Sequence, residues 1–129
     1  MRRAGVVWDH GYMRLSLLIV DDHEDFRRSA RTLLEAEGFT VVGEAGDGAE
    51  AIAKARTVRP DVLLVDIRLP DLDGFAVAEE IAAWPDPPVV VLVSSRDAVV
   101  YRSRLASTPA RGFIAKSQLS GEALADLVA

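Results

Sequence analysis

The sequence predicts an α/β fold in which a parallel sheet of five strands lies between two layers of helices, a three-layer sandwich. Five short apolar runs, each bounded by polar residues, alternate along the chain with segments whose apolar residues recur at helical spacing. Such alternation builds βαβ units, whose right-handed crossovers place helices against the sheet. The runs are apolar rather than alternating, which is typical of strands covered on both faces.

The first strand is expected at residues 15–20 and the first helix at about 25–37, with Asp25 as a capping residue. Gly38 suits the C-terminal stop of this helix. One face of the helix is apolar, through Phe26, Ala30, Leu33 and Leu34. The second strand follows at residues 40–45.

The second helix is expected to begin at Asp47, because Glu50 three residues later gives a spacing that resembles a capping box. It runs to about Thr57, and Pro60 lies beyond its end. The third strand is the apolar run at residues 62–65.

A polar loop at residues 68–74 leads to a third helix at about 75–83, with Asp73 as its cap. The proline-rich segment at residues 85–88 ends that helix, because proline removes a backbone donor and disfavours the helical conformation before it. The fourth strand follows at residues 89–93.

The fourth helix is expected at about residues 98–106, before Pro109, and the fifth strand at residues 112–115. Ser120 can cap a short last helix at 122–128. The flavodoxin-like (βα)5 order, 2-1-3-4-5, places the switch point of the sheet between the first and third strands.

One domain is expected, over residues 14–129. Residues 1–13 are interpreted as an N-terminal extension that is disordered or arises from a start upstream of the true one, since Met13 could itself be a start. The net charge of −5 argues against direct binding of nucleic acid by this domain. No apolar stretch approaches the roughly 20 residues that span a bilayer, so no membrane association is expected. The chain has no cysteine, which fits a cytoplasmic location.

Polar side chains follow four of the predicted strands. Asp21 and Asp22 follow the first, Asp66 the third, Ser94 the fourth and Lys116 the fifth. Because ligands of such sheets bind beyond the carboxyl ends of the strands, we expect these groups to converge in one crevice.

Several carboxylates close together repel one another unless a cation intervenes, and Mg²⁺ is a hard cation that prefers oxygen ligands. Asp22 and Asp66 are candidate direct ligands, Asp21 is a candidate ligand through water, and the backbone carbonyl of Arg68 is a fourth candidate. A carboxylate can also act as a nucleophile and form an acyl phosphate, stabilised by the Lys116 charge and the Ser94 hydroxyl. No histidine or glutamate is placed as a general base, so turnover of small substrates is not expected.

Four segments carry a resemblance to a known family: Val20-Asp21-Asp22-His23, the stretch from Asp66 to Gly74, Val93-Ser94-Ser95, and Gly112-Phe113-Ile114-Ala115-Lys116. Through them the chain resembles, over about residues 15–129, a receiver domain of two-component response regulators. The segments are similar to those of the subfamily whose receivers precede a helix-turn-helix DNA-binding domain.

The resemblance implies a role for each matching residue. Asp66 would be the phosphoacceptor, and Asp21 and Asp22 would hold Mg²⁺. Ser94 would swing toward the phosphoryl group and Lys116 would pair with it. Phe113 would be an aromatic switch coupled to Ser94, although tyrosine is common at its position.

The resemblance also implies partners. The phosphodonor would be a phosphohistidine of a sensor histidine kinase, docked along the first helix, whose arginines we otherwise expect to be solvated. A homodimer could form through the face made by the fourth helix, fifth strand and fifth helix. The chain could be a stand-alone receiver or a piece of a DNA-binding regulator.

Two other functions share parts of this pattern. A phosphatase of the haloacid dehalogenase type also uses an aspartyl nucleophile but needs a second aspartate two residues later, where this chain has Arg68. A receiver-like interaction module that works without phosphorylation would keep the fold alone. A further hypothesis gives Arg68 and Arg96, each two residues after a key position, control over how water reaches the phosphoryl-aspartate.

Overall fold

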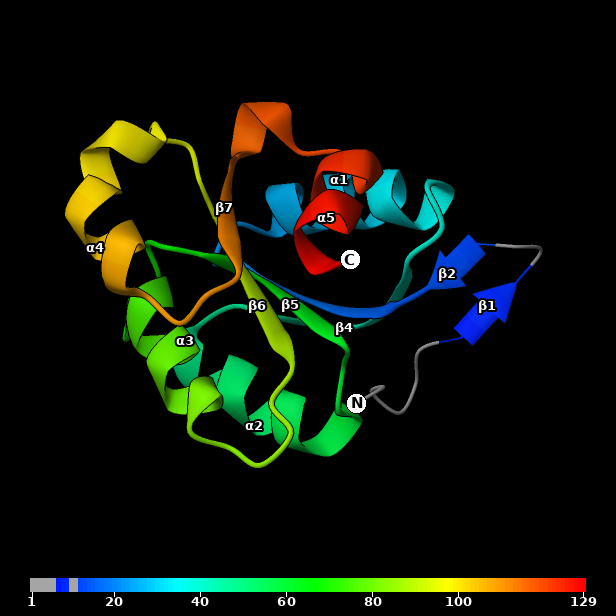
Figure 1. Ribbon diagram of the computed structural model, residues 1–129, viewed down its shortest axis with the longest axis horizontal. Coiled ribbons are helices and arrows are strands. Elements are labelled where there is room, and N and C mark those ends of the chain that lie inside the picture. The colour runs from blue at the N-terminus through cyan, green and yellow to red at the C-terminus, as the bar shows by residue number, and fades with distance from the viewer. Residues whose placement is uncertain (1–6, 10–11) are drawn as a thin grey trace.

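The computed structural model describes residues 7–9 and 12–129, and its main sheet has five parallel strands. The strand order is β4-β3-β5-β6-β7, which is the predicted order 2-1-3-4-5 (Figure 1). The main strands are β3 (Ser16–Val20), β4 (Thr40–Ala45), β5 (Val62–Asp66), β6 (Val89–Ser94) and β7 (Gly112–Ala115). The helices are α1 (Glu24–Ala36), α2 (Gly48–Val58), α3 (Gly74–Ala82), α4 (Arg102–Ser107) and α5 (Gly121–Val128), with short 3₁₀ turns η1 (Ala98–Tyr101) and η2 (Lys116–Gln118).

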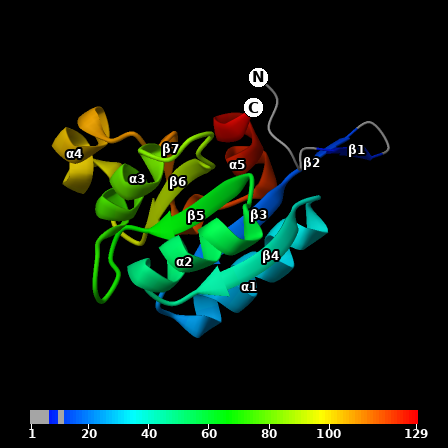
Figure 2. The ribbon, with the colours of Figure 1, turned by 90° about the horizontal axis from the view of Figure 1, so that it is seen from below.

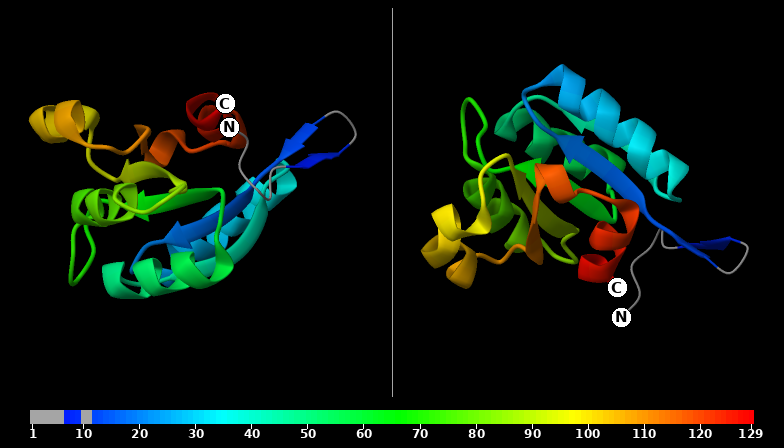
Figure 3. Two further views of the ribbon diagram at one scale, coloured as in Figure 1. Left: turned by 60° about the horizontal axis from the view of Figure 1, so that its bottom comes forward. Right: turned by 90° about the horizontal axis from the view of Figure 1, so that it is seen from above.

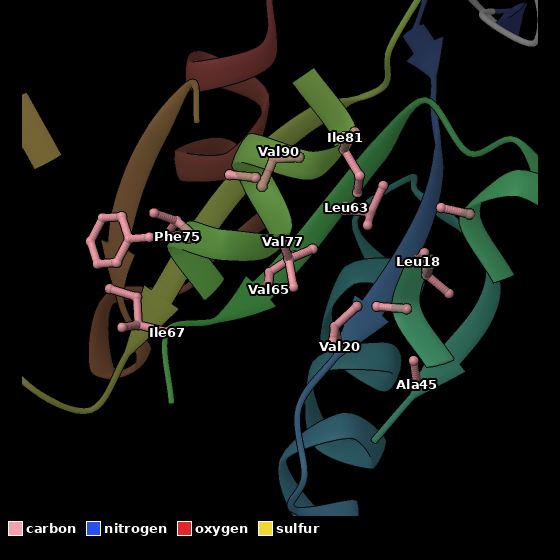
Figure 4. Packing of buried hydrophobic residues seen from close by; sticks show 14 residues of the cluster. Leu18, Val20, Ala45, Leu63, Val65, Ile67, Phe75, Val77, Ile81 and Val90 are labelled. Carbon is pink, nitrogen blue, oxygen red and sulfur yellow. The ribbon is translucent and has the colours of Figure 1, made fainter. Parts of the chain in front are cut away.

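The helices form two layers, one on each face of the sheet. Helices α1 and α5 cover one face and α2 and α3 the other, with α4 beside α3 near the β7 edge (Figures 1, 2 and 3). Alternate strand residues serve the two layers: Leu18 and Leu63 pack with α2 and α3 (Figure 4), whereas Leu17 and Leu64 pack with α1 and α5. This double burial explains why the strands read as continuous apolar runs.

Three of the predicted helix caps are confirmed. The side chains of Asp47, Asp73 and Ser120 each accept a hydrogen bond from the backbone N–H three residues later. Gly38 ends α1 with a φ of 104°, a left-handed conformation that glycine adopts without strain. The expectation for Asp25 is wrong, because α1 begins one residue earlier, with His23 at the cap position and Asp25 exposed in the first turn.

The predicted helix at residues 98–106 is in fact two pieces. It begins as the 3₁₀ turn η1 and becomes the α-helix α4 only at Arg102. Val99, Val100 and Tyr101 disfavour an α-helix because branched and aromatic side chains lose rotamer freedom there. The valines are 60% and 54% exposed, so burial of these two side chains does little to offset that cost.

The predicted N-terminal extension lies largely outside the described residues. Within it the structure describes an antiparallel pair, β1 (Val7–Asp9) and β2 (Tyr12–Arg14), and β2 leads into β3. The boundary at residue 14 stays a prediction.

Gly74 makes the close approach that places the loop after β5. A Cβ atom on Gly74 would lie 2.7 Å from the Asp66 carbonyl oxygen and 2.9 Å from Ile67 Cα, both backbone atoms that no rotamer change can move. We expect Gly74→Ala to lower the free energy of unfolding by about 1–3 kcal/mol, the usual cost of overpacking. Gly46→Ala is the matched control, because the nearest atoms to its Cβ are side-chain atoms at 3.7 and 3.8 Å. Equal denaturation midpoints for the two variants would contradict this prediction.

Candidate functional site

Four of the predicted residues meet at the carboxyl edge of the sheet. Asp66 is the last residue of β5 and Ser94 the last of β6, while Asp21 follows β3 and Lys116 follows β7. Asp21 and Ser94 are fully buried and Asp66 is only 4% exposed. Because β3, β5, β6 and β7 are neighbours in register, their ends bring residues from four separate parts of the chain to one place.

Lys116 joins the two buried carboxylates. Its ammonium nitrogen lies 2.6 Å from Asp21 Oδ2 and 3.2 Å from Asp66 Oδ2. The same nitrogen lies 4.3 Å from the centre of the Phe26 ring of α1, a cation–π contact. A positive charge therefore already stands between the two acids, and the acids are placed to hold a cation.

The two acids differ in their pKa. Burial raises the pKa of Asp66 to about 6, and the negative charge of Asp21 adds to the rise. The hydrogen bond that the Arg68 N–H donates to Asp66 acts in the opposite direction and lowers this pKa. Burial also favours a higher pKa for Asp21, but the ammonium of Lys116 and the backbone N–H of His23 outweigh this effect, so the pKa of Asp21 is lowered. Burial opposes the charge of Lys116 as well, but its two acidic partners raise its pKa.

Asp22 and His23 complete the acidic edge of the site. One ligand atom from each of Asp21, Asp22, His23 and Asp66 lies within 4.8 Å of the others. His23 Nδ1 is 3.1 Å from Asp21 Oδ1 and 3.0 Å from Asp22 Oδ1. His23 also stands at the cap position of α1, and its side chain is 69% exposed. Three carboxylates in this volume, two of them buried, are the hard oxygen donors that suit Mg²⁺.

Arg27 of α1 holds the loop that carries the acidic pair. Its guanidinium donates to the Asp21 carbonyl oxygen at 2.7 Å and to Glu44 of β4 at 3.0 Å, and Glu44 also binds Arg31 at 2.7 Å. The expectation that the arginines of this helix are solvated is therefore wrong for Arg27, whose side chain is 19% exposed. A helical pattern could not reveal it, because Glu44 lies on another element.

Ser94 contacts a residue that the sequence did not single out. Its Oγ lies 3.2 Å from the Tyr101 hydroxyl and accepts a hydrogen bond from Arg96 N–H at 3.1 Å. The Tyr101 ring in turn lies 6.3 Å from the Phe113 ring, centre to centre. The structure thus links Phe113 to Ser94 through Tyr101.

Arg68 and Arg96 are both exposed and line a groove beside the site, together with Tyr101 and Arg104. The proposed effect of these arginines on water access stays a prediction, as does the Arg68 carbonyl as a metal ligand.

Comparison with known proteins gives a consistent picture. The family described as response regulator receiver domain matches residues 17–128. A putative transcriptional regulator of Pseudomonas aeruginosa is 36% identical over 108 residues, which are 84% of this chain and 52% of the relative. The response regulator GacA of Pseudomonas syringae is 36% identical over 117 residues, 88% of this chain and 52% of GacA. The chain thus spans about half the length of these relatives.

Solved structures agree. The signal receiver domain of the putative response regulator NarL from Mycobacterium tuberculosis has a TM-score of 0.80 and 32% identity, and the match covers 89% of this chain and 96% of that one. The response regulator domain of CheB from Thermotoga maritima has a TM-score of 0.75 and 27% identity, over 88% and 92% of the two chains. Among the described residues, no helix is long and apolar enough to cross a membrane.

Proposed function

Since the chain belongs to the family of response regulator receiver domains, we propose that it is a phosphorylation-gated switch whose phosphoacceptor is Asp66. The observation that carries the proposal is the pairing of this one buried strand-end carboxylate with the ammonium of Lys116, beside Asp21. Lys116 neutralises charge on Asp66 before transfer and on the phosphoryl oxygens after it.

The metal part of the proposal rests on the three carboxylates. Asp21, Asp22 and Asp66 would hold Mg²⁺, with the Arg68 carbonyl as a further ligand. Bound there, Mg²⁺ would offset the negative charge of the phosphoryl group and favour the ionised form of the Asp66 carboxyl. The pKa of Asp66 near 6 means that, without metal, a fraction of this nucleophile is protonated close to neutral pH.

The transfer step is a displacement at phosphorus. A carboxylate oxygen of Asp66 forms the new P–O bond while the P–N bond to a phosphohistidine of a sensor kinase breaks, and the departing imidazole keeps the electron pair. Lys116 and the Ser94 hydroxyl would contact the transferred oxygens. Water later cleaves the acyl phosphate and restores the carboxylate. Catalysis is thus confined to the chain's own modification.

The partners follow from this chemistry. The kinase would dock along α1, next to the loop that Arg27 holds, and a homodimer could use the face of α4, β7 and α5. If the chain is part of a longer transcriptional regulator, another segment would bind DNA, since this domain has a net charge of −5.

The test is direct transfer to Asp66. The protein is incubated with Mg²⁺ and acetyl phosphate, a small acyl-phosphate donor, and its intact mass is measured. We expect one phosphoryl group on the wild type and none on Asp66→Asn, whereas Asp126→Asn, at an exposed site on α5, should behave as wild type. If folded wild-type protein gains no phosphoryl group from this donor or from a phosphorylated kinase, the switch account fails and the interaction module is favoured.

A further inference from the structure

The Ser94 hydroxyl is already engaged before any phosphoryl group arrives. Ser94 is fully buried, its Oγ accepts the Arg96 N–H, and the Tyr101 hydroxyl lies 3.2 Å away. In the described part of the chain the Asp66 carboxylate is instead bound by Arg68 N–H and Lys116. When the Ser94 hydroxyl donates to the Tyr101 oxygen, it must give up that contact before it can donate to a phosphoryl oxygen on Asp66.

Tyr101 ties that hydroxyl to a different layer of the fold. It is the last residue of η1 and directly precedes α4. Its ring lies between Phe75 of α3, at 6.0 Å, and Phe113 of β7, at 6.3 Å. The segment between β6 and α4 (Figure 1) therefore ends in Tyr101. The hydroxyl of this residue contacts Ser94, and its ring packs on α3 and β7.

Helix α4 has a second attachment that does not involve the site. Arg104 binds Asp73 at 2.8 Å, and its guanidinium lies 4.2 Å from the centre of the Phe75 ring. If the hydrogen bond between Tyr101 and Ser94 is lost, Arg104 still attaches α4 to α3. The turn η1, in which Val99 and Val100 are exposed, then loses its hydrogen bond to Ser94.

We propose that Tyr101 competes with the phosphoryl group on Asp66 for the Ser94 hydroxyl, so that phosphorylation releases Tyr101 and lets η1 move. This inference rests on the proposed function, and in it Tyr101 is the residue that responds when Ser94 changes its hydrogen-bond partner. A hydrogen bond from Ser94 to a phosphoryl oxygen is charge-assisted and roughly twice as strong as a neutral one to a phenol, so the phosphoryl group wins the competition. Phe113 has no hydroxyl and cannot compete in this way.

Binding of beryllium fluoride, a phosphoryl mimic, in the presence of Mg²⁺ tests the competition. Tyr101→Phe keeps the ring and removes only the competitor, so we expect its affinity to rise about 2- to 10-fold, the value of one neutral hydrogen bond. In a Ser94→Ala background the same change should have no effect. Unchanged affinity in Tyr101→Phe, or an equal gain without the Ser94 hydroxyl, would overturn the proposal.

A spectroscopic measurement separates this role from a merely structural one. The chain has two tyrosines, so 3-fluorotyrosine labelling gives two fluorine signals, and Tyr101→Phe assigns them. We expect the Tyr101 signal to shift when wild type binds beryllium fluoride. In Ser94→Ala it should start near the shifted position and stay there. If wild type binds the mimic at Asp66 and this signal does not move, only the Tyr101 inference fails; if Asp66 takes neither mimic nor phosphoryl group, both proposals fail.

Discussion

Without divalent cations, Asp66→Asn is expected to be more stable than the wild type at pH 7.5 and about equally stable at pH 4.5. Burial raises the pKa of Asp66 from 3.8 to about 6, so the folded state holds this proton more tightly than the unfolded state. At 1.36 kcal/mol per pKa unit, the difference between the two proteins at pH 7.5 is about 3 kcal/mol at most.

The direction follows from proton linkage. A carboxyl group whose folded pKa is raised favours the fold fully below its unfolded pKa, and that contribution is lost as pH rises through the folded pKa. The wild type should therefore lose stability between about pH 4 and pH 6, and the asparagine variant should not. Asp21 acts in the opposite direction, since its pKa is lowered and its contribution is lost only at lower pH.

Urea unfolding of both proteins at the two pH values, with a chelator present, measures this difference. Adding Mg²⁺ at pH 7.5 should then stabilise the wild type more than Asp66→Asn, because a ligand that binds only the folded state adds to stability. If the stability difference between the two proteins does not change with pH, ionisation of Asp66 does not destabilise the fold, and the raised pKa is contradicted.

The sheet, and the proximity of Asp21 and Asp66 to Lys116, could be predicted from the sequence alone. Parallel strands share one carboxyl edge, so the residue after each apolar run can be assigned to that edge without knowing any contact. Caps such as Asp47 and Ser120 are equally local, because each binds a backbone N–H three residues away.

What the sequence could not supply are contacts between elements that carry no periodic signal. Arg27 resembles any arginine on a solvated helix face until β4 brings Glu44 to it. Tyr101 belongs to a segment that reads as helix, and only the 3₁₀ turn places its hydroxyl on Ser94. Both residues bear on the mechanism, and both depend on the path of the backbone rather than on composition.

Lys116→Met is expected to give the largest loss of stability of any change at the site. At pH 7.5 without metal, the variant leaves the buried Asp21 and Asp66 without the ammonium that lies 2.6 and 3.2 Å from them. Removing one partner of a buried ion pair costs about 3–5 kcal/mol, because the remaining charge is uncompensated. The loss should shrink as pH falls toward 5, since without Lys116 the pKa values of both acids rise and one of them takes up a proton.

Lys54→Met is the matched control, because Lys54 is the chain's other lysine and lies on the surface, where it pairs with Glu50 at 3.1 Å and donates to the Glu44 carbonyl oxygen. An exposed pair contributes at most about 1 kcal/mol, so this variant should unfold close to wild type at every pH. Mg²⁺ should restore part of the stability of Lys116→Met, because a divalent cation can replace the missing charge between the acids, and should do less for Lys54→Met. Equal denaturation midpoints for the two variants, or an equal response to Mg²⁺, would mean that the acids do not depend on Lys116, and the electrostatic basis of the site would have to be abandoned.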